Sequence, residues 1–354
     1  MARTLLSAPP GVPCDLPSAI SDSIRPALRI VFFGTPEFAV PTLEAVARAH
    51  EVVLVVAQPD KAAGRGMRMQ PPAVALRSRE LGLPLAQPAK IRTPEFLDSM
   101  AALAPDIGVV IAYGKILPAA LLAIPKHGFV NVHASILPKY RGAAPIQRAI
   151  QAGETTTGVT IMRVDEELDH GPMLAVAKLE IGEDEREPSL AKRLSILGAD
   201  AILPALDAIE HGTANESSQD HDRATIAPKI AKQEGAIRWS DSAVCIYNRF
   251  RAFDPWPGLF CEWRGEAIKL TKLMNCGHEV TRSRGHEAGG ALPRDLETSN
   301  PRDPGTIEAI GDGVTVTTGD GTIRILEMQR PGKPRAAAAD VARGLGWRVG
   351  ERLP

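Results

Sequence analysis

Short apolar runs alternate with segments of helical periodicity through residues 28–211, and this alternation limits the fold more than any other feature of the chain. An unbroken apolar run of strand length is typical of a strand buried on both faces of a parallel sheet. Strands that alternate with amphipathic helices form such a sheet with helices on both sides. We therefore predict an α/β, doubly wound parallel-sheet domain over 28–211. Its expected strands are 28–34, 52–57, 107–112, 129–134 and 159–164, and its expected helices are 38–50, 71–81, 94–103 and 189–210.

The pattern changes after residue 211. A polar stretch rich in Gly, Ser, Asn and Asp covers 212–225 and is typical of a linker. Beyond it, a helical segment is followed by short strand-like runs, and Gly-Asp-Gly occurs twice, at 311–313 and 319–321, as tight hairpin turns require. We therefore predict a small antiparallel β-barrel (OB-like) domain over 226–354, with an extended loop at 275–303.

The first 27 residues have a different composition from the rest. They contain five prolines and lack the continuous apolar segment of a signal peptide. We predict a disordered N-terminal extension over 1–27. A transit peptide is the alternative, favoured by the serines and arginines of this segment and disfavoured by its aspartates and prolines.

The net charge and the positions of the cysteines argue against some classes of function. The net charge is −1, so any contact with nucleic acid must come from a local basic patch. The four cysteines form no CxxC pair, which argues against a zinc site and a disulfide framework and favours a reduced, cytoplasmic compartment. No apolar run reaches the ~18 residues of a membrane span.

Three polar residues predict the chemistry. Asn131 and His133 stand two apart in an expected strand, so their side chains project from one face near its carboxyl end, where open α/β sheets bind ligands. Asp169 follows the next expected strand in a turn-like loop. An amide can stabilise an oxyanion, and an imidazole oriented by a carboxylate can transfer protons near neutral pH. The trio predicts acyl transfer, although Asn-x-His in a strand is by itself more often a packing feature. No nucleophile elbow or GxGxxG motif supports a hydrolase or a dehydrogenase.

A family resemblance agrees with this trio. Residues 131–142, Asn-Val-His-Ala-Ser-Ile-Leu-Pro-Lys-Tyr-Arg-Gly, resemble the NVHxSLLPxxRG motif of folate-dependent formyltransferases, and 158–162 with 169–174 resembles their second motif. The resemblance implies that Asn131, His133 and Asp169 are catalytic, and that 10-formyltetrahydrofolate is the formyl donor with no metal involved. The folate-binding residues that it implies are Tyr113, Gly114, Ser135, Ile136, Leu137 and Pro138.

Four further stretches resemble the members of that family that act on initiator methionyl-tRNA: 33–38, 58–66, 143–147 and 252–257. This implies N-formylmethionyl-tRNA, made for translation initiation, as the product. Stretch 58–66 resembles a mobile loop that inserts at the tRNA acceptor end, and its glycines and basic side chains suit phosphate contact. The expected tRNA-binding residues are Lys61, Arg65 and Arg68; a solvated basic loop is the alternative.

A second basic set lies near the C-terminus: Arg330, Lys333, Arg335, Arg343, Arg348 and Arg352. It is consistent with a face that follows an RNA backbone and equally with a solubilising surface.

Two other functions remain open at this point. One is another formyltransferase using 10-formyltetrahydrofolate, or a formyltetrahydrofolate hydrolase; the second domain disfavours it, since a small acceptor needs none. The other is an RNA-binding module without catalysis, which the intact trio disfavours. The partners expected for the enzyme are initiator methionyl-tRNA and folate. It is expected to be monomeric and cytoplasmic, with no membrane partner.

Overall fold

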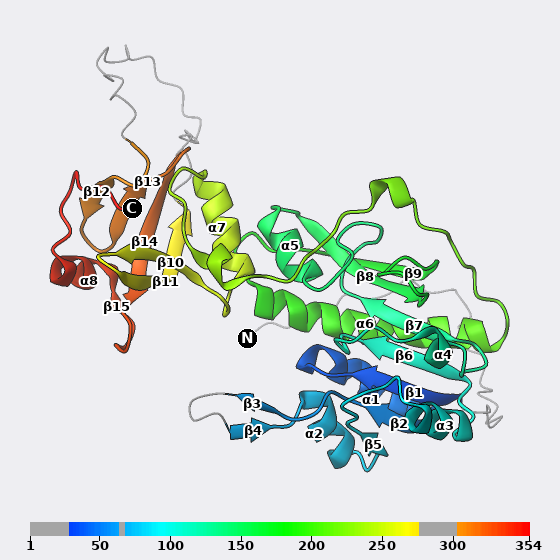
Figure 1. Ribbon diagram of the computed structural model, residues 1–354. Helices are drawn as coiled ribbons and strands as arrows, with labels where there is room; N and C mark the ends of the chain where they lie inside the picture. The colour runs from blue at the N-terminus through cyan, green and yellow to red at the C-terminus, as the bar shows by residue number, and fades with distance from the viewer. Residues whose placement is uncertain (1–27, 64–67, 276–302) are drawn as a thin grey trace, which may run out of the picture.

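The computed structural model describes residues 28–63, 68–275 and 303–354, which form two domains side by side (Figure 1). The predicted extension 1–27 lies outside the described residues, as does 276–302, the main part of the predicted loop 275–303. None of the helices in the described ranges is long and apolar enough to span a membrane.

A seven-stranded sheet forms the centre of the first domain, in the order β5-β2-β1-β6-β7-β8-β9. The strands are β1 (Arg29–Gly34), β2 (Glu51–Val56), β5 (Leu85–Ala86), β6 (Ile107–Ile111), β7 (Phe129–His133), β8 (Thr156–Arg163) and β9 (Met173–Glu180). The first five of these strands pair in parallel, with β1 between β2 and β6. The carboxyl ends of β1, β6 and β7 therefore meet at one edge of the sheet, which is the edge where the sequence places Asn131 and His133.

Helices cover both faces of this sheet, as predicted. Alternate residues of β1 face opposite ways: Ile30 and Phe32 are buried in one apolar cluster, and Val31 and Phe33 in another. The first cluster includes residues of α1 (Val40–Ala49) and of the long helix α6 (Glu187–Glu210). The second includes residues of α3 (Pro94–Ala102) and of α4 (Ala119–Leu122). Each fully buried aliphatic or aromatic side chain contributes ~1.5–3 kcal/mol to this packing.

The expectation of a wholly parallel sheet needs correction. β8 contains residues 159–163 of the predicted strand 159–164 but pairs antiparallel with β7, and β9 pairs antiparallel with β8. The reason lies in the connection between β7 and β8, whose only α-helix is the seven-residue α5 (Pro145–Gln151). This helix packs against α6 and not along the sheet as a crossover helix would, so the connection does not form the crossover that a parallel pairing needs.

The second domain is an antiparallel sheet, as predicted, in the order β10-β11-β14-β13-β12 with β15 beside β14. Its strands are β10 (Leu259–Trp263), β11 (Glu266–Asn275), β12 (Ile307–Ile310), β13 (Val314–Thr317), β14 (Thr322–Gln329) and β15 (Ala336–Ala337). The two Gly-Asp-Gly turns join β12 to β13 and β13 to β14. Among the described residues the strand pairs run in an open path from β10 to β12, without hydrogen bonds that close the predicted barrel. The helix α8 (Ala338–Leu345) follows β15.

Helix–helix packing and ion pairs join the two domains. Helix α5 packs against α7 (Ala243–Ala252) of the second domain (Figure 1). Arg148 of α5 makes a two-pronged ion pair with Glu234, with N–O distances of 2.5 and 3.0 Å. Arg186 pairs with Asp254 at 3.2 Å. Forked arginine–carboxylate pairs fix orientation as well as distance, so the second domain is held at a defined angle to the first.

Candidate active site

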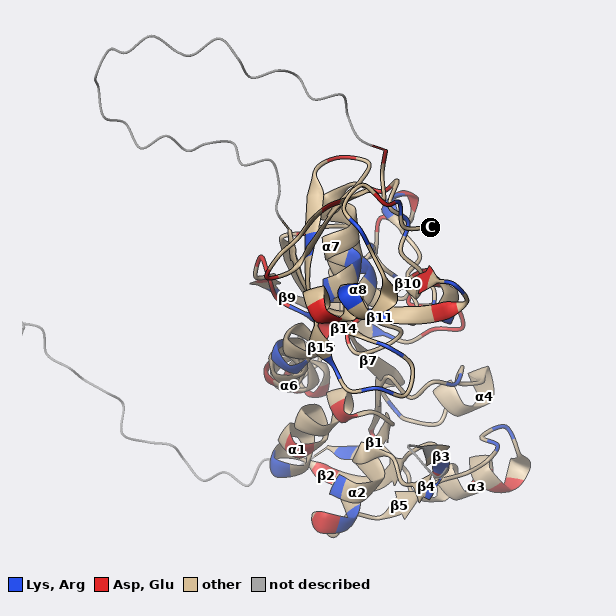
Figure 2. Ribbon diagram, turned by 90° about the vertical axis from the view of Figure 1, so that its left-hand side faces the viewer, with Lys and Arg blue, Asp and Glu red and all other residues tan. Residues whose placement is uncertain are grey.

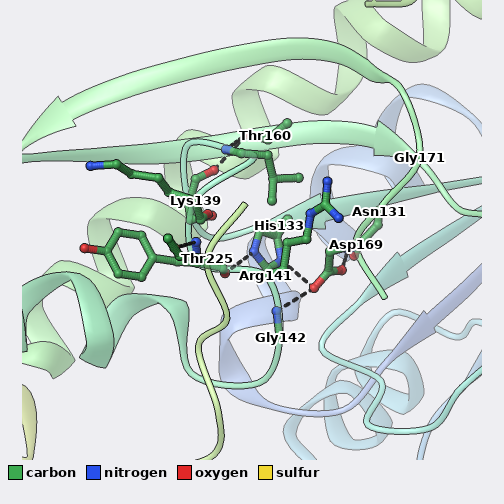
Figure 3. Close-up of polar contacts among 12 residues, drawn as sticks. Asn131, His133, Lys139, Arg141, Gly142, Thr160, Asp169, Gly171 and Thr225 are labelled. Atoms are coloured by element: carbon green, nitrogen blue, oxygen red, sulfur yellow. Dashed lines mark hydrogen bonds and ion pairs between the residues drawn. The ribbon is translucent and has the colours of Figure 1, made fainter. Parts of the chain in front are cut away.

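Asn131, His133 and Asp169 meet at the carboxyl end of β7 (Figure 3). Asn131 and His133 lie two residues apart on β7, and Asp169 comes from the loop between β8 and β9. The Asn131 Nδ2 donates to Asp169 Oδ1 at 3.3 Å, and His133 Nδ1 lies 3.6 Å from Asp169 Oδ2. The His133 and Asp169 side chains are only 6% and 13% exposed. The structure therefore brings together the three residues that the sequence singles out.

Hydrogen bonding fixes which imidazole nitrogen of His133 is free. His133 Nε2 lies 2.9 Å from the Tyr140 carbonyl oxygen, which can only accept, so Nε2 carries a proton. In the neutral ring the lone pair is then on Nδ1, the nitrogen that faces Asp169. The 3.6 Å between Nδ1 and Oδ2 exceeds hydrogen-bond length. Nδ1 is therefore the atom from which a proton can be given to, or taken from, a reacting group.

The Asp169 carboxylate is positioned by its neighbours on two sides. Besides Asn131, the Gly142 backbone N–H donates to Asp169 Oδ2 at 2.8 Å. Gly142 has φ +117°, a conformation that favours glycine, and a Cβ there would lie 2.9 Å from the Ala227 carbonyl oxygen. Asp169 itself has φ +47°, which is uncommon for a residue with a side chain. The sequence-based prediction named Asp169 but not Gly142, although Gly142 ends the quoted motif.

The predicted folate-binding residues fall into two groups. Tyr113, Ser135 and Leu137 are buried, whereas Ile136 and Pro138 are half-buried and Gly114 is exposed. Ser135 Oγ donates to the Lys139 carbonyl at 2.6 Å, so this hydroxyl is engaged within its own loop. Burial raises the pKa of Tyr113 to about 12, so its phenol stays neutral. The buried members shape the loops, and the half-buried and exposed members are the ones accessible to a ligand.

Two polar residues that sequence reasoning missed hold the Tyr113–Gly114 turn. Thr35 Oγ1 and Gln58 Nε2 both donate to the Tyr113 carbonyl, at 3.0 and 3.1 Å. Each follows a strand, β1 and β2 respectively, so the end of the sheet brings them together. Gln58 stands at the start of a stretch quoted for its family likeness, but nothing local predicts a partner 55 residues away.

A cavity of about 480 Å³ lies beside Gly114, and the sequence did not predict it. Its lining residues are Lys90, Ile91, Arg92, Thr93, Lys115 and Ile116. Lys115 Nζ donates to the backbone carbonyls of Pro88 and Ala89, at 3.3 and 2.8 Å, which ties the cavity wall together. Three basic side chains around an opening of this size suit a ligand with a carboxylate or phosphate group.

The predicted tRNA-binding residues lie on a different element from Asn131, His133 and Asp169. Lys61 and Arg68 are exposed on a two-stranded hairpin, β3 (Lys61–Ala63) and β4 (Arg68–Gln70), that follows β2 (Figure 2). Arg65 lies outside the described residues. Within the described ranges, no group of three or more His, Cys, Asp or Glu side chains is placed to hold a metal ion.

Comparison with known proteins identifies the family to which the chain is similar and several relatives. The family model described as Formyl transferase matches residues 28–206, and the one described as Formyl transferase, C-terminal domain, matches 229–346. The chain is 42% identical to the methionyl-tRNA formyltransferase of Thermus thermophilus, over 92% of this chain and 99% of that protein. It is also 42% identical to the methionyl-tRNA formyltransferase of Geobacter metallireducens, over 92% of this chain and 98% of that protein.

A solved structure shows the same fold. The N-formyltransferase from Helicobacter canadensis, in complex with folinic acid and dTDP-3-aminofucose, is 17% identical to this chain with a TM-score of 0.60. The likeness covers 86% of this chain and 99% of that one.

Proposed function

The chain belongs to the formyl transferase family, and from this premise we propose that it transfers the formyl group of 10-formyltetrahydrofolate to the α-amino group of methionyl-tRNA. The product is N-formylmethionyl-tRNA, which serves translation initiation. The observation that carries the chemistry is the convergence of Asn131, His133 and Asp169 at the carboxyl end of β7. The acceptor follows from relatives named methionyl-tRNA formyltransferase that match nearly the whole chain at 42% identity.

The reaction needs two proton movements and one transient oxyanion. The amino nitrogen attacks the formyl carbon, a C–N bond forms, and the carbonyl oxygen becomes an oxyanion. The intermediate collapses when the bond from the formyl carbon to N10 of the folate breaks, and N10 takes a proton while the former amine loses one. An enzyme for this step needs a donor at the oxygen and a group that exchanges protons at both nitrogens.

The three residues divide these tasks. Asn131 Nδ2 has two hydrogens and uses one on Asp169, so the second is available to the oxyanion. His133 Nδ1 exchanges the proton, because Nε2 is held by the Tyr140 carbonyl. Asp169 holds Asn131 in place and stabilises a positive charge on His133.

The folate is assigned to the loops beside this trio. We expect Gly114, Ile136 and Pro138 to contact it, with Tyr113, Ser135 and Leu137 shaping the pocket from behind. Folates end in glutamate carboxylates, which match the basic lining of the cavity next to Gly114. The turn follows β6, which pairs with β7, so we expect a folate bound there to reach Asn131 with its formyl group while its tail occupies the cavity.

The tRNA is assigned to the hairpin β3–β4 and to the second domain. Lys61 and Arg68 are exposed cations with reach to phosphate. We place the catalytic domain at 28–211, the linker at 212–225 and the tRNA-binding domain at 226–354; the two family models end and begin close to these bounds. Action as a monomer in the cytoplasm stays a prediction, which the mass of the protein in solution and its location in the cell would test.

The test is formylation itself. Protein mixed with methionyl-tRNA and 10-formyltetrahydrofolate should give one N-formylmethionyl-tRNA for each tetrahydrofolate released, and an Asp169→Ala control should give far less. Formate released from the folate without tRNA would instead identify a hydrolase. Turnover with a small amine but not with methionyl-tRNA would identify another formyltransferase.

A further inference from the structure

Gln219 is buried in the segment that the sequence predicts to be a linker. It is 5% exposed, and its carboxamide makes four hydrogen bonds. Gln219 Oε1 accepts from Arg141 Nε and Nη2 at 3.2 and 2.7 Å. Gln219 Nε2 donates to the backbone carbonyls of Asp169 and Gly171, at 2.9 and 2.8 Å. Both hydrogens and both lone pairs of the amide are therefore used, which is the full capacity of this side chain.

The chemistry of its partners fixes the orientation of this amide. A guanidinium only donates, so the oxygen of Gln219 must face Arg141. The Asp169 and Gly171 carbonyls only accept, so the nitrogen must face them. A flipped amide would lose all four bonds. Gln219 thus joins two loops rigidly: the loop after β7, which carries Arg141, and the β8–β9 loop, which carries Asp169 (Figure 3 shows Arg141, Asp169 and Gly171).

The segment that carries Gln219 is itself fixed to the loop after β7. The Tyr140 N–H donates to Thr225 Oγ1 at 2.9 Å, and the Arg141 N–H donates to the Thr225 carbonyl at 2.8 Å. The Ala227 N–H in turn donates to the Arg141 carbonyl at 2.6 Å. These bonds hold residues 219–227 against the site, so this segment is packed on the first domain and is not a flexible linker between domains.

A neighbouring contact supports the same loop from its other side. Arg141 Nη2 lies 2.8 Å from His221 Nδ1, and the His221 ring stacks on His170 with centroids 4.1 Å apart. His170 follows Asp169 directly, and its Nδ1 lies 2.7 Å from Asp165 Oδ2. The polar segment thus contacts the β8–β9 loop through Gln219, at the Asp169 and Gly171 carbonyls, and through His221, at the His170 ring.

The Asp169 backbone has reason to need such support. Its φ of +47° is a left-handed conformation that a non-glycine residue adopts at a cost. A peptide in this state persists only where its surroundings hold it. The Asp169 carboxylate also has to reach both Asn131 and the Gly142 N–H, so a shift of the peptide moves it away from both.

We propose that Gln219 is a positioning residue for formyl transfer, which holds the Asp169 peptide in the conformation that aims its carboxylate at Asn131 and His133. This rests on the proposed function of the same site. Gln219 touches no reacting atom in this scheme and acts through Asp169. A displacement of about 1 Å in such a group lowers turnover by roughly 10²-fold, which sets the scale of the expected effect.

The main test replaces Gln219 by Met, which has a similar length and makes none of the four bonds. Gln219→Met should lower kcat for formylation of methionyl-tRNA by roughly 10–10²-fold, with the KM for tRNA and for folate changed by less than about three-fold. Gln233→Met, an exposed glutamine later in the chain, is the matched control and should keep wild-type kcat.

A combination with Asp169 separates positioning from a general loss of structure. If Gln219 acts through Asp169, adding Gln219→Met to Asp169→Ala should lower kcat little further. Equal fold-losses in the presence and absence of Asp169 would overturn the proposal, and so would wild-type kcat in Gln219→Met.

A second variant covers the case in which Gln219→Met does not fold. Gln219→Glu keeps a side-chain oxygen facing Arg141 and removes only the N–H donors to the Asp169 and Gly171 carbonyls. It should show the same selective loss of kcat. A wild-type kcat for this variant would overturn the proposal. These outcomes are distinct from failure of the proposed function, in which the wild-type protein itself would give no N-formylmethionyl-tRNA.

Discussion

The trio of Asn131, His133 and Asp169 and the β3–β4 hairpin belong to one domain, yet their polar groups differ in how far they are held in place and shielded from water. The Asp169 carboxylate accepts from Asn131 and from the Gly142 N–H and is 13% exposed. Lys61 and Arg68 are exposed and, among the described residues, take part in no ion pair. Groups that are held in place and shielded from water stabilise a transition state. Exposed charges instead affect how fast a ligand is encountered and how tightly it binds. The trio should therefore control kcat, and the hairpin should control tRNA binding.

The largest expected effect comes from removing the proton-exchanging pair. His133→Ala or Asp169→Ala should each lower kcat by ~10²–10⁴-fold, the usual range for a positioned acid–base group. Steady-state formylation at saturating tRNA measures this, with thermal unfolding and folate binding as checks on the fold. A kcat within a few-fold of wild type for either variant would remove that residue from the mechanism. It would also contradict the claim that the trio controls kcat.

Asn131 should have the next largest effect. Asn131→Ala should reduce kcat by ~10²–10³-fold, the effect of losing one oxyanion donor, while the KM for tRNA stays near wild type. The split between kcat and KM is the informative readout, because a donor that acts only on the oxyanion binds nothing in the ground state. If KM rises and kcat does not change, Asn131 is a binding residue.

The hairpin should give smaller effects of a different kind. Lys61→Ala and Arg68→Ala should each weaken tRNA binding by a few-fold and lower the salt dependence of log Kd by about one unit, as expected for one lost phosphate contact. Their folate affinity and kcat at saturating tRNA should stay at the wild-type level. Lys178→Ala, an exposed lysine on edge strand β9 at the opposite side of the sheet, is the matched control. A loss of folate affinity with unchanged tRNA affinity would place the hairpin in the folate site instead.

The smallest effect concerns Glu187, a half-buried carboxylate outside both regions. Burial, and then the charge of Asp254, raise the pKa of Glu187 to about 7, and Gln147 Nε2 donates to its Oε1 at 3.0 Å. Because folding raises this pKa, ionisation of Glu187 lowers the stability of the folded protein. The protein keeps its full stability below the ordinary pKa of 4.5 and loses the contribution of protonated Glu187 as the pH rises through about 7.

A neutral amide at this position avoids that loss. Glu187→Gln keeps the acceptor for Gln147 and should therefore have a Tm close to wild type near pH 4.5 and a higher Tm near pH 8. Thermal unfolding of both proteins at each pH checks this. A Tm difference that is the same at both pH values would show that folding does not raise the pKa of Glu187.

The sequence predicts the elements and the trio because both depend on local patterns. Apolar runs locate β1, β2, β6 and β7, and the two-residue spacing of Asn131 and His133 puts them on one face. The direction of β8 is not local, because it depends on where the segment between β7 and β8 packs. The strand β9 was not predicted, although its residues 173–177 are all apolar; at the sheet edge all of its side chains are half-buried or exposed.

The rest of the site depends on partners distant in sequence. Gln219 contacts Arg141 across 78 residues and Asp169 across 50, so its polar neighbours in the chain indicate only a linker. The C-terminal basic set shows the same limit. Arg330 pairs with Glu266, and Arg352 with Asp303. Such pairs reduce the free positive charge that a count along the sequence indicates.

The central claim is that His133 and Asp169 act as one unit on a single tetrahedral intermediate, and a double-mutant cycle tests it most directly. Single-turnover formylation of methionyl-tRNA would be measured for wild type, His133→Ala, Asp169→Ala and the double variant, with folate and enzyme in excess. Residues that act as a unit are strongly non-additive, so the double variant should lose far less than the product of the two single losses. A loss equal to that product would show that the two side chains act independently and would contradict the account.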